Sequence, residues 1–208
     1  MTTYDEQLAA MAGYGDKEPG AQGTAEWLYS RVGFCTGSRF ADVMDFRRDG
    51  KDGAKRAVYR AELVVERLTG RPVEKYVSAP MEWGTEHEGA ARMAYEAATG
   101  RMVEEVGFTH HPSIRMCGGS VDGLVEDSGI IEIKCPTSQT HIATLLAHTC
   151  EHVAQIQGYL WITGRQWCDF VSYDPRMPDG LKLYVQRIAR DDAYIAERIQ
   201  QCDERRAA

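Results

Sequence analysis

Residues 120–134 contain two short apolar runs joined by a polar Asp-Ser-Gly turn. Apolar runs of this length on either side of such a turn predict a β-hairpin. Asp122 lies on the first predicted strand, and Glu132 and Lys134 lie on the second. Because side chains alternate faces along a strand, Glu132 and Lys134 project the same way, and the intervening isoleucines face the opposite side. The hairpin therefore gathers two carboxylates and an amine at one edge of a sheet.

This pattern has two interpretations. In one, the segment is a surface hairpin whose Glu132–Lys134 ion pair contributes little to stability. In the other, the carboxylates form a site for a hard cation beside a proton-handling amine, as metal-assisted phosphodiester hydrolysis requires. The second is favoured because both charges lie inside an apolar run that should be buried, where unpaired charge is costly. Cys135-Pro136 also ends the strand there, which places the charges at its end.

The chain has 208 residues, enough for one domain with a sizeable core. Its net charge of −7 lowers the expectation of nucleic-acid binding, but bound cations would offset an acidic cluster. Six scattered cysteines without a C-x-x-C pair argue against a zinc or iron–sulfur site and fit reduced thiols in a cytosol. We expect no membrane segment and no secretion signal.

Along the chain, residues 1–23 are Gly-rich and polar, so we expect a flexible N-terminal segment with a weak helix over 5–11, followed by a single domain over 24–208. Gly33–Ser38 reads as a tight polar turn and Arg47–Arg56 as an exposed basic loop. Helices are predicted over 26–31 with Thr24 as cap, 38–44 with Ser38 as cap, 54–69, 81–99 ended by Gly100, 139–148, 151–163 and from 191. Strands are predicted over 103–110, 118–125, 130–135, 167–173 and 181–188. This order indicates an α/β (α+β) domain with a small central mixed sheet flanked by helices.

Several motifs, in order along residues 26–185, carry a family resemblance. They are Glu26-Trp27-x-x-x-Arg31-x-Gly33 with Thr36-x-Ser38, Trp83-Gly84-x-x-x-Glu88-x-x-Ala91-Arg92, Ser120-Val121-Asp122-Gly123-Leu124, Glu132-Ile133-Lys134-Cys135-Pro136, Ala154-Gln155-Ile156-Gln157 and Tyr173-Asp174-Pro175-Arg176-Met177. On these motifs the chain resembles the lambda-type phage exonucleases, the YqaJ-like viral recombinases of the PD-(D/E)xK nuclease superfamily. The resemblance implies a restriction-endonuclease-like core. The proline that names the superfamily is Val121 here, a change that removes no ligand.

The resemblance implies a metal site. Asp122 and Glu132 would bind one or two Mg²⁺ or Mn²⁺ ions, with the backbone carbonyl of Ile133 as a further ligand and Glu88 as the third carboxylate. Lys134 would orient or deprotonate the attacking water. A few carboxylates with water and substrate phosphate suit Mg²⁺, although Mn²⁺ accepts the same set. The alternative for Glu88 is a solvated helix residue.

Two helical residues, Gln155 and Tyr159, lie four apart on one face and would hold the water or the phosphate. Gln157 points away from them and is interpreted as structural. His87 and His152 were considered as ligands, but a neighbouring or surface role is favoured for both.

The resemblance also implies a pocket for the 5′-terminal phosphate, formed by Arg31, Ser38 and Ser120, with Trp27 and Tyr159 as further DNA-binding residues. An Arg fork and hydroxyls suit an anion, whereas an ordinary exposed helix charge is the alternative for Arg31. The family carries a further Arg after the residue matching Pro136, and this chain has Thr137-Ser138-Gln139 instead, which weakens the expected preference for a phosphorylated end. The basic loop 47–56 would contact or split the duplex end, or is simply solvated.

Together these features predict a metal-dependent 5′-to-3′ exonuclease on linear double-stranded DNA. It would release mononucleotides and leave 3′ single-stranded tails for phage recombination. The resemblance further implies a homo-trimer, a single-strand annealing partner protein, and a phage- or prophage-encoded protein in the bacterial cytoplasm. The alternatives are a site-specific endonuclease on the same core and a non-catalytic DNA-end-binding module.

Overall fold

The computed structural model describes residues 20–74 and 76–204. The helix expected over 5–11 and most of the segment 1–23 lie outside these residues. A five-stranded mixed sheet organises the fold, in the order β2 (Val103–Glu104), β5 (Gly123–Val125), β6 (Gly129–Lys134), β7 (Trp167–Tyr173) and β8 (Leu183–Ala189). The β6–β7 pair is parallel and the other pairs are antiparallel. The mixed sheet expected from the sequence is confirmed.

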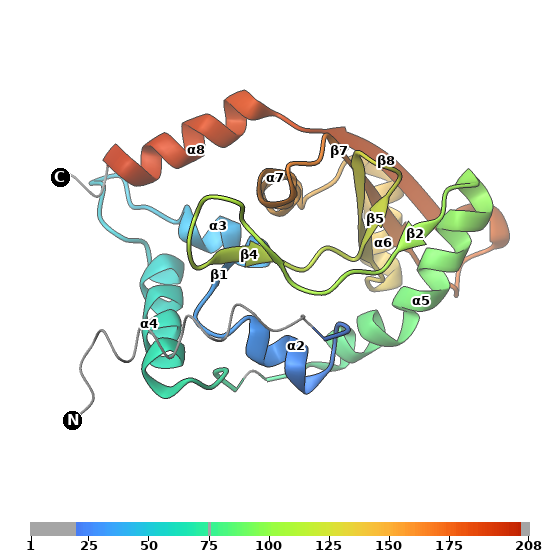
Figure 1. The fold of residues 1–208 in the computed structure, drawn as a ribbon. Coiled ribbons are helices and arrows are strands. Elements are labelled where there is room, and N and C mark those ends of the chain that lie inside the picture. The colour runs from blue at the N-terminus through green and yellow to red at the C-terminus, as the bar shows by residue number, and fades with distance from the viewer. Residues whose placement is uncertain (1–19, 75, 205–208) are drawn as a thin grey trace.

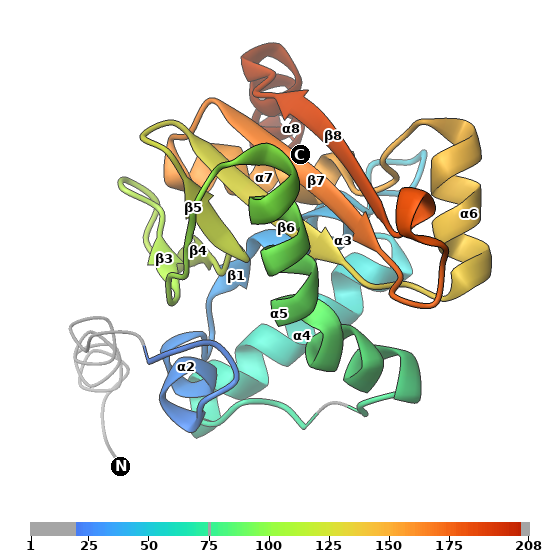
Figure 2. The same ribbon diagram turned by 90° about the vertical axis from the view of Figure 1, so that its right-hand side faces the viewer.

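Helices cover both faces of this sheet (Figures 1 and 2). On one face, α5 (Ala79–Thr99) packs Ala91 and Tyr95 against Ile131, Ile133 and Val171. On the other, α7 (Val153–Thr163) contributes an apolar run that packs against Ile130, Cys168 and Phe170. The alternation of β6 side chains between these two clusters places Glu132 and Lys134 on the α7 side.

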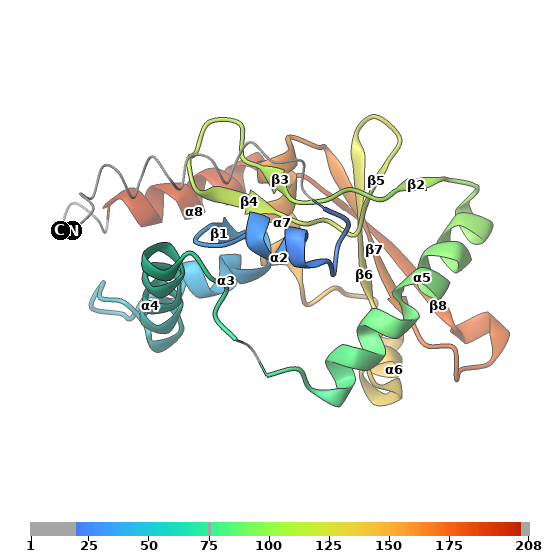
Figure 3. The ribbon, with the colours of Figure 1, turned by 60° about the horizontal axis from the view of Figure 1, so that its bottom comes forward.

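A second, three-stranded sheet has the order β1 (Cys35–Thr36), β4 (Cys117–Gly119) and β3 (Thr109–His110). Around it lie α2 (Ala25–Ser30), a 3₁₀ turn η1 (Gly37–Arg39), α3 (Phe40–Val43) and α4 (Ala54–Thr69). Figure 3 shows β1 and α2 between α4 and α5, with a long segment that leads from α4 to the first turn of α5. The remaining elements are α6 (Ser138–Ala147), η2 (Asp179–Leu181) and α8 (Asp192–Glu204).

Two predicted strands were wrong in extent. Segment 103–110 divides into β2 and β3, and segment 118–125 divides into β4 and β5, each half in a different sheet. The chain bends at Asp122. The preceding residue, Val121, is fully buried, and there the chain leaves the direction of β4. Gln22 replaces the missing ladder contacts by donating from Nε2 to the carbonyl oxygens of Val121 (2.6 Å) and Val106 (3.3 Å).

Three further local expectations were corrected. The predicted turn 33–38 contains β1, whose Cys35 aligns with Cys117 of β4. Ser38 does not cap a helix, because it lies within η1 with its Oγ 3.2 Å from Thr36 Oγ1. The last strand begins at residue 183 rather than 181, since η2 precedes it.

The other helices were confirmed to within about two residues. Thr24 caps α2 by accepting a hydrogen bond from Trp27 N at 3.2 Å. Gly100 ends α5 in the left-handed conformation, with φ of 70°, as the C′ glycine expected from the sequence. Within the described part of the chain, we find no helix that combines the length and the apolarity needed to cross a bilayer.

Candidate active site

The β5–β6 hairpin forms as predicted, with Gly123 opposite Ile131. Asp122 was expected on the first strand but lies at the bend just before it. Its Oδ2 accepts a hydrogen bond of 2.6 Å from the backbone N of Ile133, so the bend holds the carboxylate against β6. Glu132 is only 2% exposed and accepts a hydrogen bond from Lys134 Nζ. The buried ion pair expected from the sequence is therefore present.

A second contact, from helix α7, fixes the carboxylate of Glu132. Gln155, on α7, donates from Nε2 to Glu132 Oε1 at 2.6 Å and lies 3.4 Å from the hydroxyl of Tyr159. Tyr159 is buried, and a Cβ on Gly37 or Gly119 would lie within 2.4 or 2.8 Å of its ring. Those glycines let the ring lie directly against β4 and η1. The prediction that Tyr159 touches DNA stays a prediction.

Electrostatic coupling within this group is strong. Burial raises the pKa of Asp122, and the nearby carboxylate of Glu132 raises it further. For Lys134, burial alone would lower the pKa, but Glu132 and Asp122 together raise it above its ordinary value. Lys134 is thus an ammonium that offsets part of the negative charge of the hairpin.

Glu88 reaches the same region from α5. It is half-buried, and its carboxylate lies 3.3 Å from Arg92 one turn away. Burial raises the pKa of Glu88, Arg92 lowers it in part, and Glu132 adds to the rise. The charges of the hairpin therefore act on the pKa of Glu88, although Glu88 Oε1 accepts a hydrogen bond from Arg92.

The residues fit a divalent cation in one specific respect. Glu132 Oε2 is buried and has no hydrogen-bond partner, a costly state for a carboxylate oxygen that a cation would relieve. Among the residues that the structure describes, no group of three His, Cys, Asp or Glu side chains is gathered around one point. The set is thus Asp122 and Glu132, with the Ile133 carbonyl and Glu88 as further predicted ligands, and suits an ion that keeps several waters.

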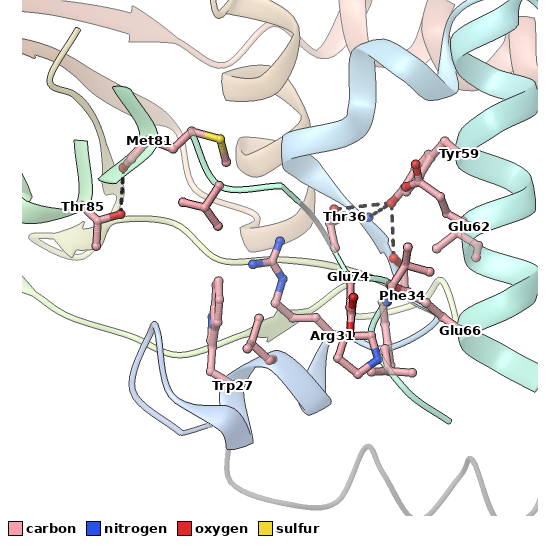
Figure 4. A pocket seen from close by; sticks show the side chains of 16 residues that line it. Trp27, Arg31, Phe34, Thr36, Tyr59, Glu62, Glu66, Glu74, Met81 and Thr85 are labelled. Atoms are coloured by element: carbon pink, nitrogen blue, oxygen red, sulfur yellow. Dashed lines mark hydrogen bonds between the residues drawn. The ribbon is translucent and has the colours of Figure 1, made fainter. Parts of the chain in front are cut away.

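A pocket of about 570 Å³ opens between α2, β1, α4 and the segment that leads into α5, and its lining does not include Asp122, Glu132 or Glu88. In Figure 4, the side chains of Trp27 and Arg31 both point into it from α2. Arg31 Cζ lies 4.2 Å above the Trp27 ring, and no ion pair or side-chain hydrogen bond to Arg31 is found among the described residues. Burial lowers the pKa of Arg31. A half-buried guanidinium without a counter-ion is a site for an anion.

The glutamates that line the pocket do not neutralise Arg31 by contact. Glu62 pairs with Arg39 at 2.8 Å. Glu66 accepts hydrogen bonds from the backbone N of Gly33 (2.9 Å) and of Val73 (3.2 Å). Two of the three glutamates that line the pocket, Glu62 and Glu66, thus hold its walls together, and no ion pair of Arg31 with any of the three is found among the described residues.

The structure brings only some of the predicted phosphate-binding residues to the pocket. Trp27 Nε1 donates to Ser120 Oγ at 2.8 Å, which joins α2 to the loop before Asp122. Ser38 is exposed and bonds Thr36, which lines the pocket, but neither Ser38 nor the buried Ser120 lines it. Sequence reasoning missed Tyr59, whose hydroxyl accepts from Thr36 N at 2.9 Å and fixes that wall (Figure 4).

The structure also places the basic loop and Gln157. In the predicted basic loop, Arg56 lies on the first turn of α4 and pairs with Asp52, as does Arg60 further along that helix, whereas Arg48 and Lys51 are exposed. Gln157 bonds the backbone of Ala189 (2.8 Å) and Asp191 (2.9 Å), the structural role expected for it.

The two histidines considered as ligands lie beside the site. His87 stacks on Trp83 with ring centroids 3.6 Å apart. His152 is half-buried at the start of α7, where burial and then Lys134 lower its pKa.

The family model of the YqaJ-like viral recombinase domain matches residues 26–166, more than half of the chain. The chain belongs to the YqaJ-like viral recombinase family. The matched region of this family spans Arg31, Glu88, the hairpin and Gln155. A search of curated proteins found no match.

Solved structures of similar proteins agree with this membership. The alkaline exonuclease LHK-Exo from Laribacter hongkongensis is 45% identical, with a TM-score of 0.79, over 88% of this chain and 91% of that one. Its complex with dAMP gives 46% identity and the same TM-score and coverage. A phage-related exonuclease from Haemophilus somnus 129PT, at 18% identity and a TM-score of 0.60, covers 83% of this chain and 89% of its own and shows the shared fold. The fold is restriction-endonuclease-like, as the sequence predicted.

Proposed function

We propose that this protein is a metal-dependent exonuclease that degrades one strand of linear double-stranded DNA from its 5′ end. The observation that carries the proposal is that Tyr159 neighbours both the acidic hairpin and Arg31, a half-buried guanidinium that contacts no carboxylate among the described residues. The Tyr159 hydroxyl lies 3.4 Å from Gln155 Nε2, which donates to Glu132 Oε1, and it interacts electrostatically with Arg31. An anion pocket beside a cation site suits a nuclease that grips a terminal phosphate. Family membership and the exonuclease LHK-Exo support this reading.

In this proposal the protein residues have separate tasks. Arg31 and Ser120 hold the terminal phosphate, and Asp122, Glu132, Glu88 and the Ile133 carbonyl hold Mg²⁺ or Mn²⁺. When bound, the cation activates water and offsets charge on the phosphate. Lys134 and Gln155 orient the carboxylate of Glu132, and the Lys134 ammonium lies where it can hold or move a proton of the attacking water.

The finer features follow from the family. The products would be mononucleotides and 3′ single-stranded tails, used in phage recombination in the cytoplasm of a bacterial host. The active form would be a homo-trimer that works with a single-strand annealing protein. The complex of LHK-Exo with dAMP supports mononucleotide release, since dAMP is a mononucleotide.

The decisive experiment uses a linear duplex labelled at either the 5′ or the 3′ terminus, incubated with Mg²⁺. We expect the 5′ label to be released first as a mononucleotide, and covalently closed circular DNA to stay intact. Earlier release of the 3′ label would contradict the polarity.

The same assay separates the alternatives. A site-specific endonuclease on this core would cut the circle into fragments. A DNA-end-binding module would retain both labels with or without Mg²⁺, yet would still shift the linear duplex in a binding assay. The complete set of Asp122, Glu132 and Lys134 favours catalysis over this second alternative.

A further inference from the structure

Arg176 lies outside every role assigned so far, although its motif is part of the family resemblance. Its guanidinium forms a fork on Asp174, with Nε 2.7 Å from Oδ1 and Nη2 3.0 Å from Oδ2. Asp174, just after β7, has no exposed surface, and its Oδ1 also accepts from the backbone N of Arg176 at 3.0 Å. The buried carboxylate thus fixes both the backbone and the side chain of Arg176.

The same guanidinium reaches two other elements. Nη2 donates to the carbonyl oxygen of Pro136 at 3.2 Å, two residues beyond Lys134 at the end of β6. On its face, Arg176 Cζ lies 4.3 Å from the ring centroid of Trp83, in the first turns of α5. That helix carries Glu88 five residues later. Arg176 therefore joins the ends of β6 and β7 to the helix that supplies the third carboxylate.

This junction has consequences for the predicted metal ligands. Glu132 and Glu88 come from different elements on different faces of the sheet, so no backbone ladder fixes their separation. The ring of His87 stacks on the ring of Trp83, and its Nδ1 donates to the backbone O of Trp83 at 2.9 Å. These contacts fix the Trp83 ring to the helical turn just before Glu88. The Arg176–Trp83 contact holds the first turns of α5 near the end of β6, while Ala91 and Tyr95 pack the later turns of α5 on the sheet.

We propose that Arg176 is a positioning residue that holds α5 against the end of β6 and thereby brings Glu88 within reach of a cation bound by Asp122 and Glu132. The proposal rests on the metal-dependent function proposed above. Residues that orient metal ligands typically alter metal affinity or activity 10–100-fold when replaced. Arg176 does not touch the pocket of Arg31, so its replacement should leave DNA binding unchanged.

The chain offers a closely matched control in Arg187. Its guanidinium forms a fork on buried Asp169, at 2.8 and 2.9 Å, and stacks on Trp167 at 3.6 Å. The side chains of Arg176 and Arg187 are equally exposed, at 44%. The hydrogen bonds and ring contact of Arg187 stay within β7 and β8, and the hydrogen bond that joins Asp169 to α5 comes from Tyr95 (2.7 Å), seven residues after Glu88 and away from the end of β6. The two arginines thus share their chemistry and differ in place.

The test compares Arg176→Lys with Arg187→Lys, since lysine keeps the charge but loses the fork and the stack. For each, Mn²⁺ affinity of the metal-free protein is measured by calorimetry, with the unfolding temperature, kcat, and KM for a linear duplex. We expect similar losses of unfolding temperature. Only Arg176→Lys should weaken Mn²⁺ binding, by about tenfold or more, and lower kcat with KM unchanged.

Equal Mn²⁺ affinity and kcat in the two variants would overturn the positioning role. If Arg176→Lys does not fold, Trp83→Leu against Trp83→Phe gives the same comparison from the other partner, because only phenylalanine keeps a ring under the guanidinium. Equal Mn²⁺ affinity in that pair would also overturn the proposal. Wild-type protein that binds no Mn²⁺ would overturn the metal site itself, a failure visible without any variant.

Discussion

At the residue scale, Lys134 is the group whose removal should lower the rate most directly. Its ammonium contacts Glu132 and lies at the end of β6, about one third exposed. We expect Lys134→Ala to lower kcat about 10²–10⁴-fold, the range for a group that handles a proton, with the fold kept. Single-turnover hydrolysis and circular dichroism measure the two effects.

Lys182→Ala is the matched control for that loss. Lys182 pairs with the exposed carboxylate of Asp179 at 2.6 Å and lies just before β8, two strands away from β6, outside the group of Asp122, Glu132 and Glu88. The control should keep wild-type activity. Near-wild-type hydrolysis by Lys134→Ala would remove Lys134 from the chemistry.

Arg31 supports a prediction about the DNA end. Loss of a hydrogen bond to a charged group costs roughly 1.5–3 kcal/mol, about tenfold or more in rate. We therefore expect Arg31→Ala to slow attack on 5′-phosphorylated ends at least that much more than attack on 5′-hydroxyl ends. Arg101→Ala, which breaks a surface pair with Glu126, should slow neither. Equal slowing at both ends by Arg31→Ala would exclude it from the phosphate pocket.

Residue-level chemistry was predictable wherever it follows from alternation along one strand, as with Glu132 and Lys134. Asp122 lies against β6 as expected, but at a bend and not within a strand. Its bend depends on Val121 entering the core and on Gln22 satisfying the backbone, both contacts between distant parts of the sequence. Tyr59 and Glu66 shape the pocket through backbone hydrogen bonds, and no motif or spacing points to them.

At the scale of elements, the ends of β6 and β7 are held by the Asp174–Arg176 pair. Burial alone would raise the pKa of Asp174, but hydrogen bonds from Arg176 and Ser138 lower it from 3.8 to about 2. A carboxyl group with a lowered folded-state pKa adds stability above its unfolded pKa and loses it as pH falls through the folded value. This stabilisation is thus complete above about pH 5 and disappears between about pH 4 and pH 2.

We accordingly expect Asp174→Asn to lower the free energy of unfolding at pH 7 by about 1 kcal/mol, a value discounted because solvent screens the half-exposed Arg176. The difference from wild type should shrink below about pH 4, as urea unfolding at several pH values would show. Asp179→Asn, at a 98% exposed carboxylate, should change little at any pH. A gap for Asp174→Asn that stays constant down to pH 3 would contradict this account.

Elements with a strong local signal were found from the sequence, and elements made by distant pairing were not. Helices α4 and α5 follow from periodicity and a terminal glycine. The two-residue strands β1, β2 and β3 exist only because partners elsewhere in the chain align with them. Gly118 and Gly119 lie where a Cβ would meet Phe108 and Tyr159, a packing requirement that the sequence does not reveal.

At the scale of the whole molecule, the fold class and family were accessible because six motifs recur in order, whereas the relative placement of the two sheets was not. The net charge of −7 has a counterpart in the structure, since Asp122, Glu132 and Glu88 crowd one region with Lys134 as the cation among them. Such crowding opposes folding unless a further cation is bound. Loss of one of these carboxylates should therefore raise stability and lower activity, so stability and function oppose each other at this site.

That opposition gives a prediction about metal removal. Asp122→Asn keeps the acceptor for the backbone N of Ile133 while it removes one charge, so the metal-free variant should unfold at or above the wild-type temperature. Mg²⁺ at a hundred times its Kd should stabilise the wild type by about 2.7 kcal/mol, and each kcal/mol raises the unfolding temperature by roughly 2–4 °C in a chain of this size.

The variant should show little of that Mg²⁺-dependent rise. Thermal unfolding of both proteins in EDTA and in Mg²⁺ checks both halves of the prediction, and K⁺ at matched ionic strength controls for screening. A variant that Mg²⁺ stabilises as much as the wild type would place the cation elsewhere, because the hairpin would then have lost a ligand without loss of binding.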